Sequence, residues 1–235
     1  MLFSSLGLAA SAQQIQVSRT NKTIYVSAEG SASSDPDVVT VNVGYENYAP
    51  TQQQAYDDNL RASQRILDAL FAAGITKQQI ESNSVTVQQM DPDKSWTPEM
   101  QRERQFHAGQ DWTLHLAAKD AQGIVDLVMR AGANILGNVS WDVSDHIRLQ
   151  AEASKAALEK ARLIADQMAA GLNAKLGELV YASNTSPLRN YFPWSGVLNT
   201  SSATLGRAGV TKPSLQLFPE KVTEKTTVYA VFAIQ

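Results

Sequence analysis

The chain has 235 residues, of which 43% are hydrophobic and 18% are charged, and its formal net charge is −3. This length and composition suit a globular protein with a sizeable core, and the weak negative charge argues against nucleic acid as a partner, because phosphate binding requires concentrated positive charge. The absence of cysteine excludes disulfides, thiolate catalysis and cysteine-ligated zinc.

The first twelve residues form a short apolar run that ends in Ala10-Ser11-Ala12. Small residues at this spacing are typical of a signal-peptidase site, so we interpret residues 1–12 as a signal-peptide remnant and expect a periplasmic or secreted mature chain that begins at Gln13. The alternative is an incidental apolar tail, since the run lacks the usual basic residues before it. No other stretch has the length of a membrane span, so no integral membrane segment is expected.

Two stretches near the start, residues 22–30 and 37–48, alternate hydrophobic and polar residues. A period of two is typical of strands with one buried face. We expect these strands to pair as a hairpin, with Gly30 opening a turn-rich connector that reaches Pro36.

A helix is expected next, beginning at Thr51 and ending at Gly74. Thr51 and Gln54 have the spacing of a capping box, and glycine commonly follows the last turn of a helix. Residues 83–90 return to the strand pattern. The polar run 91–105, with two prolines, predicts an exposed loop or a hairpin tip.

The following segment contains a strand, a short helix and a second strand. Residues 106–118 alternate in hydrophobicity, as strands do. Asp120 then caps a short amphipathic helix that Gly132 closes, and a strand is expected through residues 139–143.

The longest helical signal begins near Ser144 and is built on alanine. Its alanines recur at every fourth position, at residues 153, 157, 161, 165 and 169. This ladder predicts a long Ala-rich helix near residues 145–176 that lies close against a sheet, because alanine side chains keep the two near each other. Strands are expected at 178–183 and at the apolar end of the chain, the latter inside the sheet.

Together these elements predict an α+β fold. Hairpin strands stand beside helix–strand units, so we expect a mainly antiparallel sheet with three helices packed on one face. Residues 13–235 are expected to form a single domain.

The sequence offers few groups with the spacing of a catalytic or metal site. The three histidines, His107, His115 and His146, do not stand at metal-ligand spacing, and no zinc-protease, serine-hydrolase or phosphate-loop motif is present. We therefore expect no catalytic residues, no metal and no cofactor. The enzymatic alternative is a hydrolase that uses His115 or His146 with a nearby carboxylate.

An aromatic cluster stands out in the polar run 184–212: Tyr191, Phe192 and Trp194. Aromatic side chains in a polar segment are costly unless they pack on something. They either fold back on their own domain or contact a partner, and we take these three residues as the candidate interface.

Several segments resemble one family when their order and spacing are considered together. The stretch IYVSAEGSASSDPDVVTVNVGYE carries an E-G-x-A-x-x-x-P-D pattern from Glu29 to Asp37, and Gly132-Ala133-Asn134 follows the short helix. With the alanine-rich helix, they are similar to the SIMPL (DUF541) family over residues 22–235.

The resemblance implies a periplasmic or secreted α+β protein without established catalytic activity. Members of the family have been linked to oxidative-stress tolerance, and some assemble into large oligomers. We therefore expect a non-enzymatic homo-oligomer that acts through self-association, using edge strands and the segments 91–105 and 184–212. The alternative is a small-ligand or lipid binding protein of the cell envelope.

Overall fold

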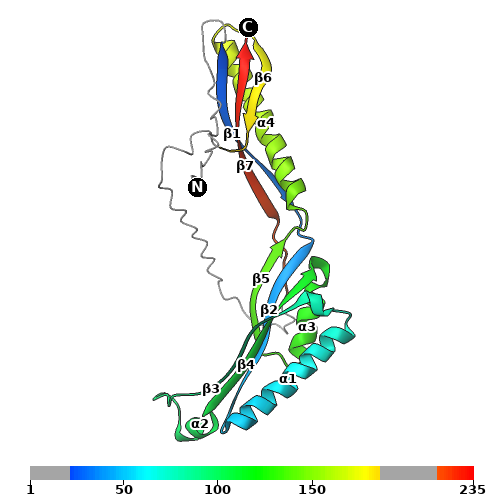
Figure 1. Ribbon diagram of the computed structural model, residues 1–235, viewed down its shortest axis with the longest axis vertical. Helices are drawn as coiled ribbons and strands as arrows, with labels where there is room; N and C mark the ends of the chain where they lie inside the picture. Colours follow the sequence, from blue (N-terminus) through cyan, green and yellow to red (C-terminus); the bar gives the residue numbers. More distant parts are fainter. Residues whose placement is uncertain (1–21, 186–215) are drawn as a thin grey trace, which may run out of the picture. The chain divides into compact units, whose positions relative to one another are not determined.

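The computed structural model describes residues 22–185 and 216–235 of the chain (Figure 1). These residues divide into two compact units. The three-stranded unit contains residues 22–32, 147–185 and 224–235, and the four-stranded unit contains residues 33–146 and 216–223.

The three-stranded unit is a sheet with one long helix on one face. Its strands are β1 (Thr23–Ser34), β7 (Val222–Ile234) and β6 (Leu176–Ser183), in the order β1-β7-β6. The helix α4 (His146–Gly171) lies along the sheet (Figure 1). The prediction that the last strand lies inside the sheet is confirmed, because β7 has a neighbour on both sides.

The alanine ladder allows α4 to lie very close to β1. All five ladder alanines are buried, and the last four, from Ala157 to Ala169, pack with apolar residues of β1 and β7. A Cβ atom placed on Gly30 would lie 2.5 Å from the carbonyl O of Ala153 and closer still to the backbone N of Ala157. Only a glycine therefore fits at this point of contact. Gly30 lies within β1 and does not open a turn, so that prediction was wrong.

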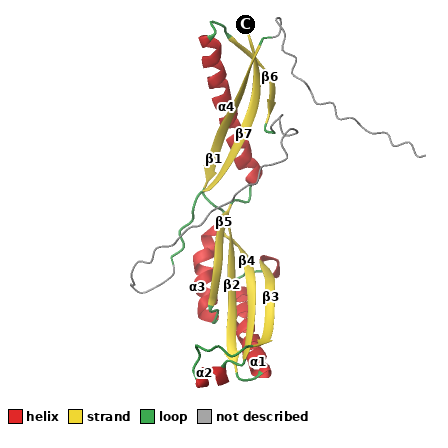
Figure 2. Cartoon of the chain, turned by 90° about the vertical axis from the view of Figure 1, so that its left-hand side faces the viewer, coloured by secondary structure: helices red, strands yellow, loops and turns green. Residues whose placement is uncertain are grey.

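The four-stranded unit is an antiparallel sheet with two helices on one face (Figure 2). Its strands lie in the order β3 (Ile80–Gln89), β4 (Phe106–Ala117), β2 (Val38–Ala49) and β5 (Ile135–Asp142). The helices α1 (Gln52–Ala72) and α3 (Ala121–Ala131) cover a core that includes Trp112, Leu114, Ile66 and Leu70.

The short elements of this unit lie at its connections. The turns η1 (Lys77–Gln79) and η2 (Ala118–Asp120) precede β3 and α3, and the helix α2 (Pro98–Glu103) lies between β3 and β4. Because β3 and β4 pair with each other, the predicted hairpin tip at 91–105 is confirmed. Among the residues that the structure describes, no helix is both long and apolar enough to cross a membrane.

The predicted α+β class and antiparallel pairing are confirmed, but the strands form two sheets and not one. The three long helices consequently do not share a face, since α4 packs in one unit and α1 and α3 in the other. The long helix ends at Gly171, before residue 176, where β6 begins.

The expected hairpin of the first two strands is also wrong, because β1 lies beside β7 while β2 lies between β4 and β5. Asp37 fixes the start of β2 next to the end of β5. Its backbone N–H donates to the carbonyl O of Asp142 at 3.1 Å, and its carboxylate accepts from the N–H and hydroxyl of Ser144 at 2.7 and 2.6 Å.

Candidate functional site

Each of the three histidines faces a carboxylate, in three different places. His107 Nε2 lies 3.2 Å from Glu46, His115 Nε2 lies 3.5 Å from Glu81, and His146 Nε2 lies 3.1 Å from Asp142. The pairing that the enzymatic alternative requires is thus present at His115 and His146. Both of these pairs are exposed, however, and water screens such surface pairs strongly.

Metal binding finds no support in the part of the chain that the structure describes. Within residues 22–185 and 216–235, no group of three or more histidine, aspartate or glutamate side chains is arranged to hold a metal ion. The expectation that there is no metal site rests on the sequence and stays a prediction.

The Gly132-Ala133-Asn134 motif has a structural role. Gly132 ends α3 in a left-handed conformation, with φ of 115°, which glycine adopts without strain. The amide of Asn134 then bonds to the backbone of Glu46 in both directions, donating to its carbonyl O at 2.7 Å and accepting from its N–H at 2.9 Å. The motif therefore ends a helix and ties the following strand to β2.

The motif from Glu29 to Asp37 acts in a similar way. Gly30 lets α4 lie against β1, and the carboxylate of Asp37 holds Ser144. In both motifs, the residues that make these contacts hold neighbouring backbone segments in place. The sequence pattern of the motifs is therefore explained by packing and hydrogen bonding.

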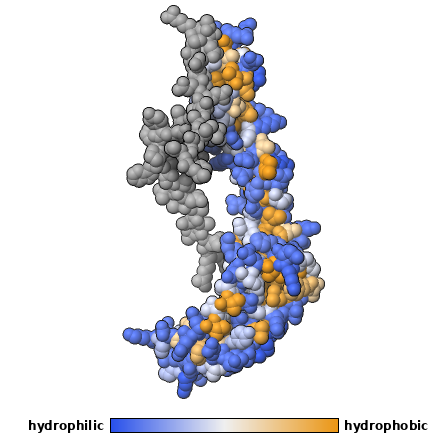
Figure 3. Space-filling view, viewed as in Figure 1, coloured by the Kyte–Doolittle hydropathy of each residue, from blue (hydrophilic) through white to orange (hydrophobic). Residues whose placement is uncertain are grey.

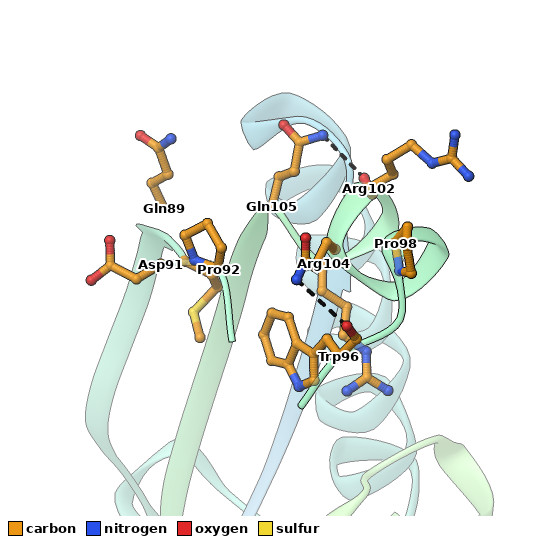
Figure 4. A pocket seen from close by; sticks show the side chains of 10 residues that line it. Gln89, Asp91, Pro92, Trp96, Pro98, Arg102, Arg104 and Gln105 are labelled. Atoms are coloured by element: carbon orange, nitrogen blue, oxygen red, sulfur yellow. Dashed lines mark hydrogen bonds between the residues drawn. The ribbon is translucent and has the colours of Figure 1, made fainter. Parts of the chain in front are cut away.

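A pocket of about 490 Å³ lies at the end of the β3–β4 hairpin (Figure 4). We call it the hairpin pocket, and its lining includes Met90, Pro92, Trp96, Arg102 and Arg104. Its size falls in the range of small-molecule sites, and it combines apolar and charged side chains as such sites do.

Local hydrogen bonds hold the chain around this pocket in place. The carboxylate of Asp93 accepts from the N–H and hydroxyl of Ser95 at 2.8 and 2.7 Å, and these bonds lower the pKa of Asp93. The side chain of Gln101 donates to the carbonyl O of Asp93 at 3.1 Å. The N–H of Met90 donates to the carbonyl O of Gln105 at 2.8 Å and closes the base of the connection.

Arg104 lies between two aromatic rings. Its guanidinium carbon is 5.6 Å from the ring centroid of Trp96 and 5.3 Å from that of Tyr48. Both distances allow cation–π attraction. The ring of Tyr48 is in turn 5.0 Å from that of His107, centroid to centroid, which continues the row into β4.

A second apolar surface lies between α1 and β3, which is the edge strand of its sheet. We call it the β3–α1 groove and define it by Tyr56, Leu60, Val85 and Val87. The first three are exposed by 48%, 42% and 65%, and Tyr56 and Val87 line a hollow of about 540 Å³. Hydrophobic surface is visible over α1 and the neighbouring strands of this unit in Figure 3.

The aromatic residues predicted as an interface, Tyr191, Phe192 and Trp194, lie outside the described residues, so their role stays a prediction. Sequence reasoning missed the hairpin pocket. A signal was available in the sequence, because Trp96 is an aromatic residue within the polar segment 91–105 and Arg104 lies in the same segment.

Comparison with known proteins identifies one family. The model of the SIMPL family, described as "Protein of unknown function (DUF541)", matches residues 24–232. Two relatives, from Brucella melitensis biotype 1 and Brucella abortus, are both named 26 kDa periplasmic immunogenic protein. Each is 30% identical over 88 residues, which are 37% of this chain and 35% of the relative. The match therefore spans about a third of the length of these curated relatives.

Proposed function

This chain belongs to the SIMPL (DUF541) family, and we propose that it is a non-enzymatic protein of the cell envelope that acts by associating with copies of itself. The names of both Brucella relatives agree with the periplasmic or secreted location expected from the N-terminal residues. A contribution to oxidative-stress tolerance, as the family resemblance implies, is part of the same proposal.

The observation that carries the proposal is the free edge of β3. In the order of the sheet, β3 has β4 on one side and no neighbour on the other among the described strands. Its sequence, IESNSVTVQQ, has a single charged residue, Glu81, and neither lysine nor proline. Natural edge strands usually carry such residues to prevent pairing with other chains.

The β3–α1 groove gives this edge an apolar side. Val85 and Val87 are opposite Gln110 and Ala108 of β4, and Ala108 packs with Val87 and with Ala55 of α1. Both valines therefore lie on the face of the sheet that α1 covers. Two copies of the chain can pair their β3 strands in antiparallel fashion about a twofold axis. This pairing would bury Val85 and Val87 of each copy beside Tyr56 and Leu60 of the α1 helices.

Charge is compatible with this arrangement. Glu81 lies near one end of β3, so two antiparallel copies place it away from its counterpart in the partner. The register of β3 against β4 shifts only between Ser82 and Ser84. The regular segment from Ser84 to Gln89 thus offers main-chain groups for pairing.

The test is the mass of the chain from Gln13 to Gln235, measured by light scattering after gel filtration. We expect a discrete oligomer for the wild type and a smaller species for Val85→Lys, which places a charge in the proposed contact. Val180→Lys is the matched control, because Val180 is also exposed, by 54%, on the edge strand β6. A monomeric wild type, or a Val85→Lys variant of unchanged mass, would contradict the proposal.

The second candidate function is the binding of a small ligand or a lipid. One observation favours it, the hairpin pocket with its mixed apolar and charged lining. A ligand that binds the native state raises its stability, so a thermal-shift screen with envelope metabolites and lipids tests this candidate. An unchanged melting temperature across a broad set would count against it.

A further inference from the structure

Arg104 has unused hydrogen-bonding capacity at the hairpin pocket. Its guanidinium is held between Trp96 and Tyr48, and no carboxylate of residues 22–185 or 216–235 pairs with it. In Figure 4 its guanidinium lies beside Trp96, whereas the side chain of Arg102 points away from both. Stacking on ring faces leaves the N–H groups at the edge of a guanidinium free to donate.

We infer that the hairpin pocket binds a small monocarboxylate with a flat apolar body. The carboxylate pairs with Arg104, because the planar fork of a guanidinium matches the two oxygens of a carboxylate. The body of the ligand lies against Trp96, with Met90 and Pro92 as further apolar contacts. This inference rests on the second candidate function, ligand binding, and is independent of self-association.

The charge of the lining selects a monoanion. Arg102 and Arg104 are the two cations of the lining and Asp91 is its one anion, and of the two cations only Arg104 lies beside Trp96. A single carboxylate neutralises the charge of Arg104. A dianion such as a phosphate monoester would leave a negative charge uncompensated beside Asp91, which disfavours it.

The apolar part of the lining selects a flat body. The Trp96 ring offers a face on which an aromatic ligand stacks, and such ring pairs add to the gain from burying apolar surface. The amides of Gln101 and Gln105 already donate to the carbonyl O atoms of Trp96 and Arg102. They therefore hold the wall of the pocket in place, and Arg104 remains the principal donor for the ligand.

The test is calorimetric titration of the chain from Gln13 to Gln235 with 2-naphthoate, and with 2-naphthamide as its neutral analogue. The wild type is expected to bind naphthoate at least roughly tenfold more tightly than naphthamide, as a charge-assisted hydrogen bond provides. Arg104→Gln is expected to lose about the same factor. Arg102→Gln, which removes the same charge two residues away, is expected to change the affinity by less than about threefold.

Three results would overturn the inference: no binding of naphthoate by the wild type at millimolar concentration, equal affinity for naphthoate and naphthamide, or equal losses in the two arginine variants. The second result does not depend on the folding of any variant. Val85→Lys is titrated in parallel and is expected to retain naphthoate binding whatever its mass. The failure of self-association and the failure of ligand binding are therefore distinguishable.

Discussion

The two units of this chain build their cores from opposite kinds of side chain. In the three-stranded unit, buried alanines of α4 lie so close to β1 that Gly30 touches the helix backbone. In the four-stranded unit, Trp112, Leu114 and Leu70 fill the space between sheet and helices. The core of the three-stranded unit, which we call the thin core, therefore has no room for an added atom. The core of the four-stranded unit, which we call the thick core, is filled by large side chains, so removing one of them leaves a cavity.

The largest loss of stability is expected when a large side chain is removed from the thick core. Trp112 is 1% exposed, and we expect Trp112→Ala to lower the free energy of unfolding by about 3–5 kcal/mol through lost burial and the cavity left behind. Urea unfolding followed by circular dichroism measures the loss. Phe218→Ala is the control, because Phe218 is exposed and lies outside the β3–α1 groove. A similar small effect for both variants would show that Trp112 does not support the core.

A smaller loss is expected from adding a single carbon to the thin core. Gly30→Ala forces β1 and α4 apart, and overpacking of this kind costs about 1–3 kcal/mol. The same change in α3, Gly123→Ala, meets no atom within 4 Å and is expected to stabilise the protein by about 0.5–1 kcal/mol. Equal effects of the two substitutions on the urea midpoint would refute the close contact of α4 with β1.

The smallest effect on stability is expected from the aromatic residues of the predicted interface. The double substitution Phe192→Ala and Trp194→Ala is expected to change the free energy of unfolding by less than about 0.5 kcal/mol while lowering the mass of the assembly. Light scattering and urea unfolding of the same sample separate the two. A large loss of stability with unchanged mass would place these residues in a core and remove them from the interface.

The thin core was the more predictable of the two from sequence. An alanine at every fourth position signals both the helix α4 and its close packing. In the four-stranded unit, Thr51 and Gly132 likewise mark helix ends by local chemistry alone. Local patterns of this kind involve residues only a few positions apart, which is why they can be seen in the sequence.

The pairing of strands was not predictable in the same way. Alternation shows that β1 has one buried face, but it does not reveal which strand lies beside it. The neighbour of β1 is β7, which follows it by almost the whole described chain. The stacking of Arg104 on Tyr48 was hidden for the same reason, because Tyr48 comes from β2, a strand distant in sequence.

The position of β7 has a consequence for the order in which the chain folds. The four-stranded unit draws its strands and helices from one continuous segment, residues 33–146, whereas the three-stranded unit joins segments from near both ends of the described chain. Its middle strand, β7, is the last element in sequence. Contacts between distant segments form slowly, because a long loop must close first.

We therefore expect the four-stranded unit to fold while the chain is still emerging, and α4 to wait with its alanine face uncovered until β7 arrives. In that interval the chain exposes apolar helix surface and unpaired strand edges, the features that invite misassembly. The arrival of β7 at the centre of its sheet therefore decides when the three-stranded unit is complete.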